Sequence, residues 1–403
     1  MSGAFSAFVF CMFSKDSFSI IPGDRAWQER ERVRKRREYT LQAALLLVLA
    51  IAIAAIATNV ESNLAVKHIR SGFGFLSNPA GFEISDRMIE YGSRDPFWKA
   101  FLVGLLNTLK VSAWAILSST VLGILVGLMR LAKNPLIRFF GAAHVEAYRN
   151  VPLLVLLLAL YLAVTELLPG VRQALHFGNW VYLSKSGLLF AVPQWGVAAV
   201  LGSMAVGAVV AYMLYRRLCR TATSLVSGFA GFGAFILIFL VAWVICGAAG
   251  GWNHPIQSRF SMSGGLHLTP EFLTLWLGLT LFTSASIAEI VRAGVQSVRV
   301  AQWDAALALG LTRGEAVSYV IFPQALRLIV PPLASQYMSL TKNSSLAVMV
   351  GYSDLVNIGT TAMNVTGQAL EVICIIMSVY LVVNLVTSWV MNRFNARIMM
   401  APQ

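Results

Sequence analysis

Eight apolar stretches of membrane-spanning length limit most strongly what this chain can fold into. A helix needs about 20 mostly apolar residues to cross a bilayer, because lipid cannot satisfy exposed backbone polar groups. The chain is 57% hydrophobic and 12% charged, whereas soluble domains carry about 25% charged residues. This composition argues against a cytosolic globular enzyme, a disordered chain or a nucleic-acid-binding module. The predicted spans are Leu41–Ala57, Phe97–Leu131, Val151–Leu168, Val192–Tyr215, Phe229–Gly250, Phe272–Val291, Leu328–Val350 and Leu370–Met391.

The distribution of basic residues predicts the orientation of these spans. Segments assigned to the cytoplasm hold 21 of the 31 Lys and Arg residues, and outer segments hold 7. Because basic loops stay in the cytoplasm, we expect an all-α integral membrane protein with about eight transmembrane helices and both termini cytoplasmic. The cytoplasmic segments are 1–40, 130–150, 215–228, 292–330 and 392–403, and the outer ones are 59–97, 169–191, 251–270 and 351–369.

Two of these loops have further expected roles. The basic run Arg25–Arg37 precedes the first span and is expected to anchor it at anionic lipid. We read the net charge of +13 as a sign of membrane topology rather than of nucleic-acid binding. The long outer segment 59–97 is expected to cap the helices, with partner docking as the alternative.

The sequence of the cytoplasmic loop after the sixth span predicts regular structure rather than a simple connecting loop. Gln302–Leu309 is a short helix candidate, and Gly310 suits a helix stop because glycine takes the left-handed conformation freely. A second helix is expected to begin near Thr312, with Glu315 completing a capping box, and Pro323 is expected to end or kink it. The pattern is a helix–turn–helix on the membrane surface.

The spacing of this loop resembles the EAA motif of ABC-importer permeases. That motif reads Glu-Ala-Ala, three residues, Gly, nine residues, then Ile-x-Leu-Pro, and here Asp, Val and Phe replace Glu, Ile and Leu at the same spacing. The matching residues are Asp304-Ala305-Ala306, Gly310 and Val320-Ile321-Phe322-Pro323.

Further segments resemble the polar amino-acid (histidine/glutamine-type) permeases, and most closely permease subunits of general L-amino-acid importers. The match covers about residues 98–165 and 270–392. The resemblance implies a type I ABC importer core with one extra N-terminal helix and two inserted helices. Its expected parts are a cytoplasmic segment 1–40, a first span with outer loop 41–97, a permease domain 98–392 containing the insertion 170–270, and a tail 393–403. The matching segments are Gly104–Lys110, Tyr148–Leu154, Ala288–Gly294, Phe322–Arg327 and Lys342–Leu346.

The resemblance implies a non-catalytic subunit that moves polar or broad-range L-amino acids across the bacterial inner membrane by alternating access. No GxxxxGK[ST] phosphate loop occurs in the chain, so ATP would be used by a partner. Implied partners are a second homologous permease, two ATP-binding subunits, a periplasmic amino-acid-binding protein and membrane lipid; no cofactor, metal or nucleic acid is expected. The alternative is an ion-coupled secondary transporter. Residues expected to couple to the ATPase are Gln302, Asp304, Ala305, Ala306, Gly310 and Pro323.

Polar side chains inside apolar spans indicate a substrate pathway or helix–helix contacts. Hydroxyls, amides and helix ends can hold the carboxylate and ammonium of an amino acid near the membrane midplane. Glu289 and Arg292 lie three residues apart and can instead pair with each other. Which amino acids are carried stays open at this point. The candidate pathway residues are Thr283, Ser286, Glu289, Ser339, Lys342, Asn343 and Ser344.

Two other patterns carry weaker expectations. GxxxG spacing at Gly123–Gly127 and at Gly247–Gly251 predicts close helix packing. The five histidines show no metal-ligand spacing and are expected at the surface.

Overall fold

The computed structural model describes residues 25–66, 72–194, 197–218, 224–258 and 262–399, in two compact units, Met1–Ser71 and Gly72–Gln403. In the first unit, helix α2 (Arg25–Val66) contains the basic run and the predicted first span Leu41–Ala57. Residues 1–24 of the predicted cytoplasmic segment lie outside the described residues. Arg34 pairs with Glu38 on an exposed face of α2, at 3.0 Å.

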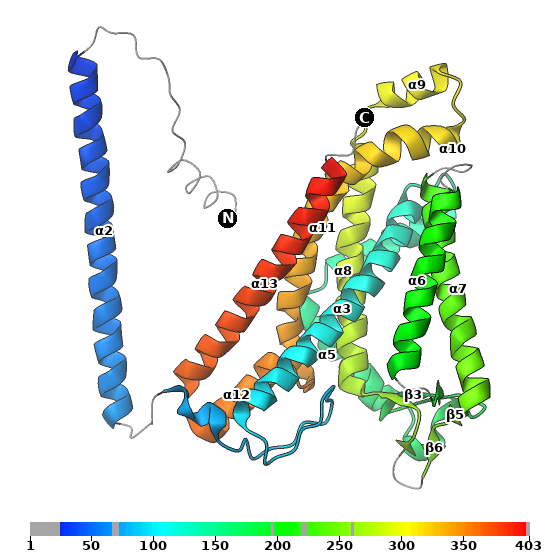
Figure 1. Cartoon of the computed structure of the whole chain (residues 1–403), viewed down its shortest axis with the longest axis horizontal. Helices are drawn as coiled ribbons and strands as arrows, with labels where there is room; N and C mark the ends of the chain where they lie inside the picture. The colour runs from blue at the N-terminus through cyan, green and yellow to red at the C-terminus, as the bar shows by residue number, and fades with distance from the viewer. Residues whose placement is uncertain (1–24, 67–71, 195–196, 219–223, 259–261, 400–403) are drawn as a thin grey trace. The chain divides into compact units, whose positions relative to one another are not determined.

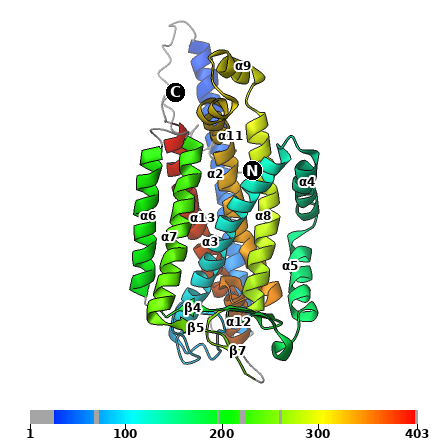
Figure 2. The same ribbon diagram turned by 90° about the vertical axis from the view of Figure 1, so that its right-hand side faces the viewer.

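The second unit is a set of long helices with small structures at both ends. Figures 1 and 2 show α9 and α10 at one end, and α12 with the short strands at the other. These ends correspond to the predicted cytoplasmic and outer sides. The helices are α3 (Phe97–Arg130), α4 (Pro135–Arg149), α5 (Leu153–Leu162), α6 (Val197–Leu218), α7 (Ser224–Gly250), α8 (Pro270–Gln296), α9 (Val300–Ala308), α10 (Arg313–Glu315), α11 (Phe322–Asn343), α12 (Leu355–Thr366) and α13 (Ala369–Met399).

The centre of this unit is the close contact between α3 and α8. A Cβ built on Gly123 would lie 2.6 Å from Ile287, and one on Gly127 would lie 2.9 Å from Val291. Only glycine leaves room for α8 at this distance, so the first GxxxG prediction is confirmed. The second is wrong, because Gly247 accommodates the ring of Trp252 rather than another helix.

The outer segment 72–96 packs over the ends of the helices. It contains a 3₁₀ turn, η1 (Phe73–Ser77), and its buried side chains Phe75, Ile84 and Tyr91 belong to one apolar cluster with Phe97 of α3 and residues of α12 and α13. The backbone N–H of Gly72 donates to Glu371 at the start of α13, at 2.7 Å. This packing confirms, for residues 72–96, the capping role that we expected of segment 59–97.

Short antiparallel strands correct the all-α prediction, and the chain is mostly rather than wholly helical. The main sheet has the order β1-β2-β3-β8. In β2 and β3 the buried positions alternate, with Tyr182 opposite Leu189 in register, so one face of the hairpin is covered. The strands are β1 (Leu175–Phe177), β2 (Val181–Ser184), β3 (Gly187–Phe190), β4 (Val192–Pro193), β5 (Trp252–Asn253), β6 (Ile256–Gln257), β7 (Met262–Ser263) and β8 (Leu266–Leu268).

Among the described residues, five helices are long and apolar enough to cross a membrane, or six if the bent pair α4–α5 is one span. α5 continues into a π-helical turn, η2 (Ala163–Leu167). This 15-residue stretch is too short to cross a membrane alone and is long enough only together with α4, from which it is bent by 99°. The third span, predicted as a separate helix Val151–Leu168, is therefore at most half of a broken span. The predicted first and fourth spans lie in α2 and α6, whose side chains are described only in part, so the count of eight stays a prediction.

Candidate functional site

The expected coupling loop forms a compact helix–turn–helix. α9 ends at Ala308 with Leu309 as its C-cap, and Gly310 follows with a φ of 79°, the left-handed conformation that glycine adopts without strain. The Leu311 N–H then donates to the carbonyl of Ala306, at 3.2 Å. Thr312 begins α10 with a complete capping box to Glu315. The helix predicted over Gln302–Leu309 is present as Val300–Ala308, and the predictions for Gly310 and Thr312 are confirmed.

One face of α9 is anchored and the other is open. Trp303 packs against an apolar cluster that includes Ile321 and Ile329, and it lines an apolar cavity of about 400 Å³ beneath the helix. Ala306 is buried, which leaves no space for a larger side chain there. Leu309, by contrast, is 82% exposed. Sequence reasoning missed Trp303, although a tryptophan on a surface helix is itself an unusual signal.

The other predicted coupling residues are placed as follows. Asp304 and Ala305 are exposed, and Asp304 has no ion-pair partner within the part of the chain that the structure describes. Gln302 accepts a hydrogen bond from the side chain of Gln324, at 3.3 Å, which ties α9 to α11. This open arrangement leaves Asp304 and Ala305 accessible to another chain.

Pro323 does not end the second helix, which corrects one alternative of our expectation. A π-helical stretch, η4 (Ala316–Ile321), precedes it, and α11 continues from Phe322. A proline ring in an α-helix clashes with the carbonyl four residues earlier. Tyr319, the residue four positions before Pro323, belongs to the wider π-helical stretch, so the chain stays helical through Pro323.

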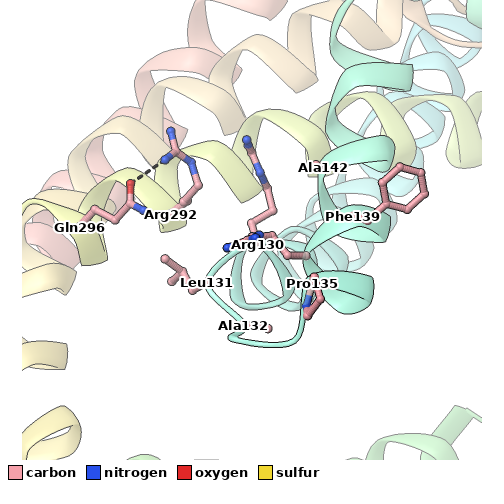
Figure 3. Close-up of a pocket in the computed structure, with 9 residues that line it drawn as sticks. Arg130, Leu131, Ala132, Pro135, Phe139, Ala142, Arg292 and Gln296 are labelled. Atoms are coloured by element: carbon pink, nitrogen blue, oxygen red, sulfur yellow. Dashed lines mark hydrogen bonds between the residues drawn. The ribbon is translucent and has the colours of Figure 1, made fainter.

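At the same end of the molecule, Glu289 is shared by two arginines. Arg130 at the end of α3 pairs with Glu289 Oε2, and Arg292 Nε donates to Glu289 Oε1 at 3.1 Å. Arg292 also donates to Gln296, at 2.5 Å, as the dashed line in Figure 3 shows. The expected Glu289–Arg292 pair is present, and Arg130 was not anticipated. Glu289 here fastens α3 to α8.

The remaining pathway candidates lie elsewhere. Thr283 is buried on α8, and Ser344 is buried at the end of α11, where it donates to the carbonyl of Thr341. Ser339 and Lys342 are exposed on α11, towards its outer end. α8 and α11 run in opposite directions, so Glu289 and Lys342 lie at opposite ends of the molecule (Figure 1). The structure does not gather the seven candidates into one site.

The outer end holds a buried polar cluster that sequence reasoning missed. Asn107 on α3 donates to the carbonyls of Asp86 and Ser353, at 2.7 and 2.9 Å. Asp354 caps α12 by accepting from the Asn357 N–H, at 2.8 Å, and its second oxygen has no partner among the described residues. Burial raises the pKa of Asp354 to about 7. Asn107 lies in the segment Gly104–Lys110 that matched the family pattern, which was the available signal.

The histidine interpretation needs one correction. His144 lies on α4 half-buried, and its Nε2 hydrogen-bonds to the hydroxyl of Ser284 on α8, at 2.9 Å. It is therefore a helix-packing residue rather than a surface residue. In the described part of the chain, no three His, Cys, Asp or Glu side chains cluster in a way that would hold a metal.

Comparison with known proteins decides the family. Residues 203–400 match the family described as binding-protein-dependent transport system inner membrane component. The chain is 38% identical to the general L-amino acid transport system permease protein AapQ of Rhizobium johnstonii, over 90% of this chain and 92% of that protein. The chain belongs to the permeases of polar amino-acid ABC transporters. It is a multi-pass inner-membrane permease of an ABC amino-acid importer, and it is not catalytic.

Other relatives agree with this permease assignment. The chain is 42% identical to the putative amino-acid ABC transporter permease YhdX of Escherichia coli, covering 84% of this chain and 88% of YhdX. It is 33% identical to BztB of Rhodobacter capsulatus, a glutamate/glutamine/aspartate/asparagine transport system permease, covering 90% and 93%. The ion-coupled alternative is thereby set aside, and the permease family implies an ATPase and a binding protein as partners.

A solved structure also resembles this chain. It is described as the crystal structure of an amino acid ABC transporter with histidines, with a TM-score of 0.46 and 22% identity over 75% of this chain and 95% of that one.

Proposed function

We propose that this permease carries polar or broad-range L-amino acids across the bacterial inner membrane by alternating access, as half of a translocation pathway. The other half would be a second homologous permease. Two ATP-binding subunits would drive the pair, and a periplasmic amino-acid-binding protein would deliver the substrate. The full chain would span the membrane eight times with both termini in the cytoplasm.

The observation that carries this proposal is a polar stripe on the open face of α11. Ser335, Ser339 and Lys342 follow each other at intervals of four and three residues, which places them on one side of the helix, and all three are exposed. Polar and charged side chains in a span are costly against lipid and mark bundle interiors or pathways. A second subunit facing this stripe would enclose a polar route between the two chains.

The chemistry of the stripe suits a zwitterion. Hydroxyls can donate to a carboxylate or accept from an ammonium, and the lysine ammonium adds a charge for the carboxylate. The names of the relatives, general L-amino acids for AapQ and both acidic and amide amino acids for BztB, favour a broad substrate range.

Coupling to ATP hydrolysis would pass through α9 and its turn. The exposed Asp304, Ala305 and Leu309 would contact the ATPase, Gln302 and the buried Ala306 would hold the helix in place, and Pro323 would begin the segment that moves. Because Trp303 packs against a cluster that contains side chains of both α8 and α11, a tilt of α9 would be transmitted to both spans. The hairpin α6–α7 and helix α2 are additions to this core.

The stripe is tested by uptake of labelled amino acids into vesicles that hold the full complex. Ser339→Leu fills the route with an apolar side chain, so we expect a raised KM or lost uptake while the assembled complex still hydrolyses ATP. Ser378→Leu is the matched control, because Ser378 is exposed on α13 away from the stripe. Unchanged uptake kinetics in an assembled Ser339→Leu complex would contradict the proposed pathway.

A further inference from the structure

A cavity lined by arginines opens at the cytoplasmic end of α3, α4 and α8. Its volume is about 630 Å³, and its walls include Arg130, Arg138 and Arg292 together with Pro135 and Phe139 of α4. Figure 3 shows Arg130 and Arg292 on neighbouring helices and Pro135 on the first turn of α4. From this cavity we infer a binding site that the transport function does not require: it holds the phosphate of an anionic phospholipid from the inner leaflet.

The charge balance of the cavity favours an anion. Arg130 and Arg292 both pair with Glu289, so one carboxylate serves two guanidinium groups. Arg138 has no ion-pair partner within the described ranges. Three positive charges therefore face one negative charge. The cavity is therefore short of two negative charges, and a phosphate group carries one or two.

The geometry favours phosphate. Guanidinium groups bind phosphate through paired N–H donors in a fixed fork. Arg130 and Arg292 are held in place, because each already donates to Glu289 from the cavity wall. Arg138 is exposed at the rim on α4, where it can close over a bound group. Arg292 already donates from all three guanidinium nitrogens to Glu289 and Gln296, so Arg138, unpaired among the described residues, supplies the free donors for a bound group.

The surface beside the cavity favours a lipid over a free anion. α4 exposes a run of large apolar side chains around Arg138, which a soluble anion does not need. The cavity also lies at the cytoplasmic ends of α3 and α8, the depth at which inner-leaflet headgroups are found, and basic pockets between spans on that side suit anionic lipids. The exposed residues are Leu136, Ile137, Phe139 and Phe140.

The site is separate from the proposed pathway. The polar stripe lies on α11 and extends towards the outer end, whereas the cavity is formed by α3, α4 and α8 at the cytoplasmic end. A bound lipid would hold α4 against α3 and α8 next to the Glu289 contact, and so would stabilise the bend between α4 and α5.

The test is native mass spectrometry of the purified full complex, titrated with phosphatidylglycerol after removal of bound lipid. We expect saturable binding that Arg138→Gln weakens by at least about tenfold, the effect of losing one charged hydrogen-bonding group. Arg393→Gln is the matched control, since Arg393 is an exposed arginine at the same predicted membrane surface. The control and the parent complex should bind alike, and phosphatidylcholine with the same acyl chains should not be retained.

Competition distinguishes the sources of the anion. Inorganic phosphate and L-glutamate should fail to displace the lipid, and Phe139→Gln should weaken lipid binding through the acyl contact. Equal binding by the parent and Arg138→Gln complexes, or equal losses in Arg138→Gln and Arg393→Gln, would overturn the site. Displacement by phosphate would assign it to a free anion, and displacement by glutamate to the transport route; both contradict the lipid. Uptake kinetics of the Ser339 variant are independent of all these results.

Discussion

Helices α7 and α8 are both apolar and 27 residues long, yet they differ in almost every other respect. In the most apolar window of α8, 61% of the residues are buried, against 6% in α7. α8 carries buried hydroxyls at Thr274, Thr280, Thr283 and Ser284, and it contacts α3, α4, α5 and α11. α7 packs mainly on α6, and the pair lies at the margin of the unit (Figure 2). Apolar length marks a span, while buried polar residues mark the helices around which the permease is built.

The strongest test of this difference is a glycine substitution in each region. Gly123→Leu would force α3 away from Ile287 of α8, and overpacking at so close an approach should cost about 3 kcal/mol, the upper end of the usual range. Gly202→Leu on α6 is the matched change, because a side chain there meets nothing within 4 Å. Thermal unfolding of the purified complex should show a large loss, or no assembly, for Gly123→Leu only. Equal stability of the two variants would remove the basis of the comparison.

A pH-dependent effect is expected at the buried polar cluster, which lies at the outer end of the core. Burial raises the pKa of Asp354 to about 7, above its usual value near 4, so the folded protein holds this proton more tightly than the unfolded chain does. Stability from this group is present at low pH and is lost as the pH rises from about 4 to about 7. Asp354→Asn can still cap α12 and should remove that loss, up to a few kcal/mol at about pH 8, since each pKa unit corresponds to about 1.4 kcal/mol.

The measurement is the unfolding temperature of the complex at several pH values between about 5 and 8. Asp95→Asn serves as the control: Lys99 and the Gly92 N–H lower the pKa of this partly exposed carboxyl, so its contribution is lost only at acid pH. If the parent and Asp354→Asn complexes lose stability equally as the pH rises, Asp354 is not the group responsible.

The cytoplasmic loop could be predicted almost residue by residue, because its signals are local. The capping box at Thr312, the left-handed Gly310 and the helix over Gln302–Leu309 each depend on neighbours within a few residues. The pairing of β3 with β8 could not be predicted in this way, since β8 follows about eighty residues later. This pairing depends on where the α6–α7 hairpin, which lies between the two strands in the sequence, places β8.

The seven pathway candidates stay a prediction, and they do not lie in one place for a different reason. Glu289 and Lys342 share a chemical type, polar residues in apolar spans, but antiparallel helices place them at opposite ends. The predicted topology already implied this separation. The pairing of Arg130 with Glu289 and of His144 with Ser284 depends on how α3 and α4 pack against α8, which no local pattern reveals.

The central claim is that the α9–Gly310–α10 turn couples ATP hydrolysis to transport, and Gly310→Val tests it most directly. A β-branched residue is strained at a φ of 79°, whereas Gly314→Val, also in open space but without a positive φ, is the matched control. ATP hydrolysis and amino-acid uptake would be measured together in vesicles holding the full complex. We expect Gly310→Val to lose most of its uptake per ATP hydrolysed while remaining assembled, and Gly314→Val to retain it. Unchanged uptake per ATP in an assembled Gly310→Val complex would contradict the account.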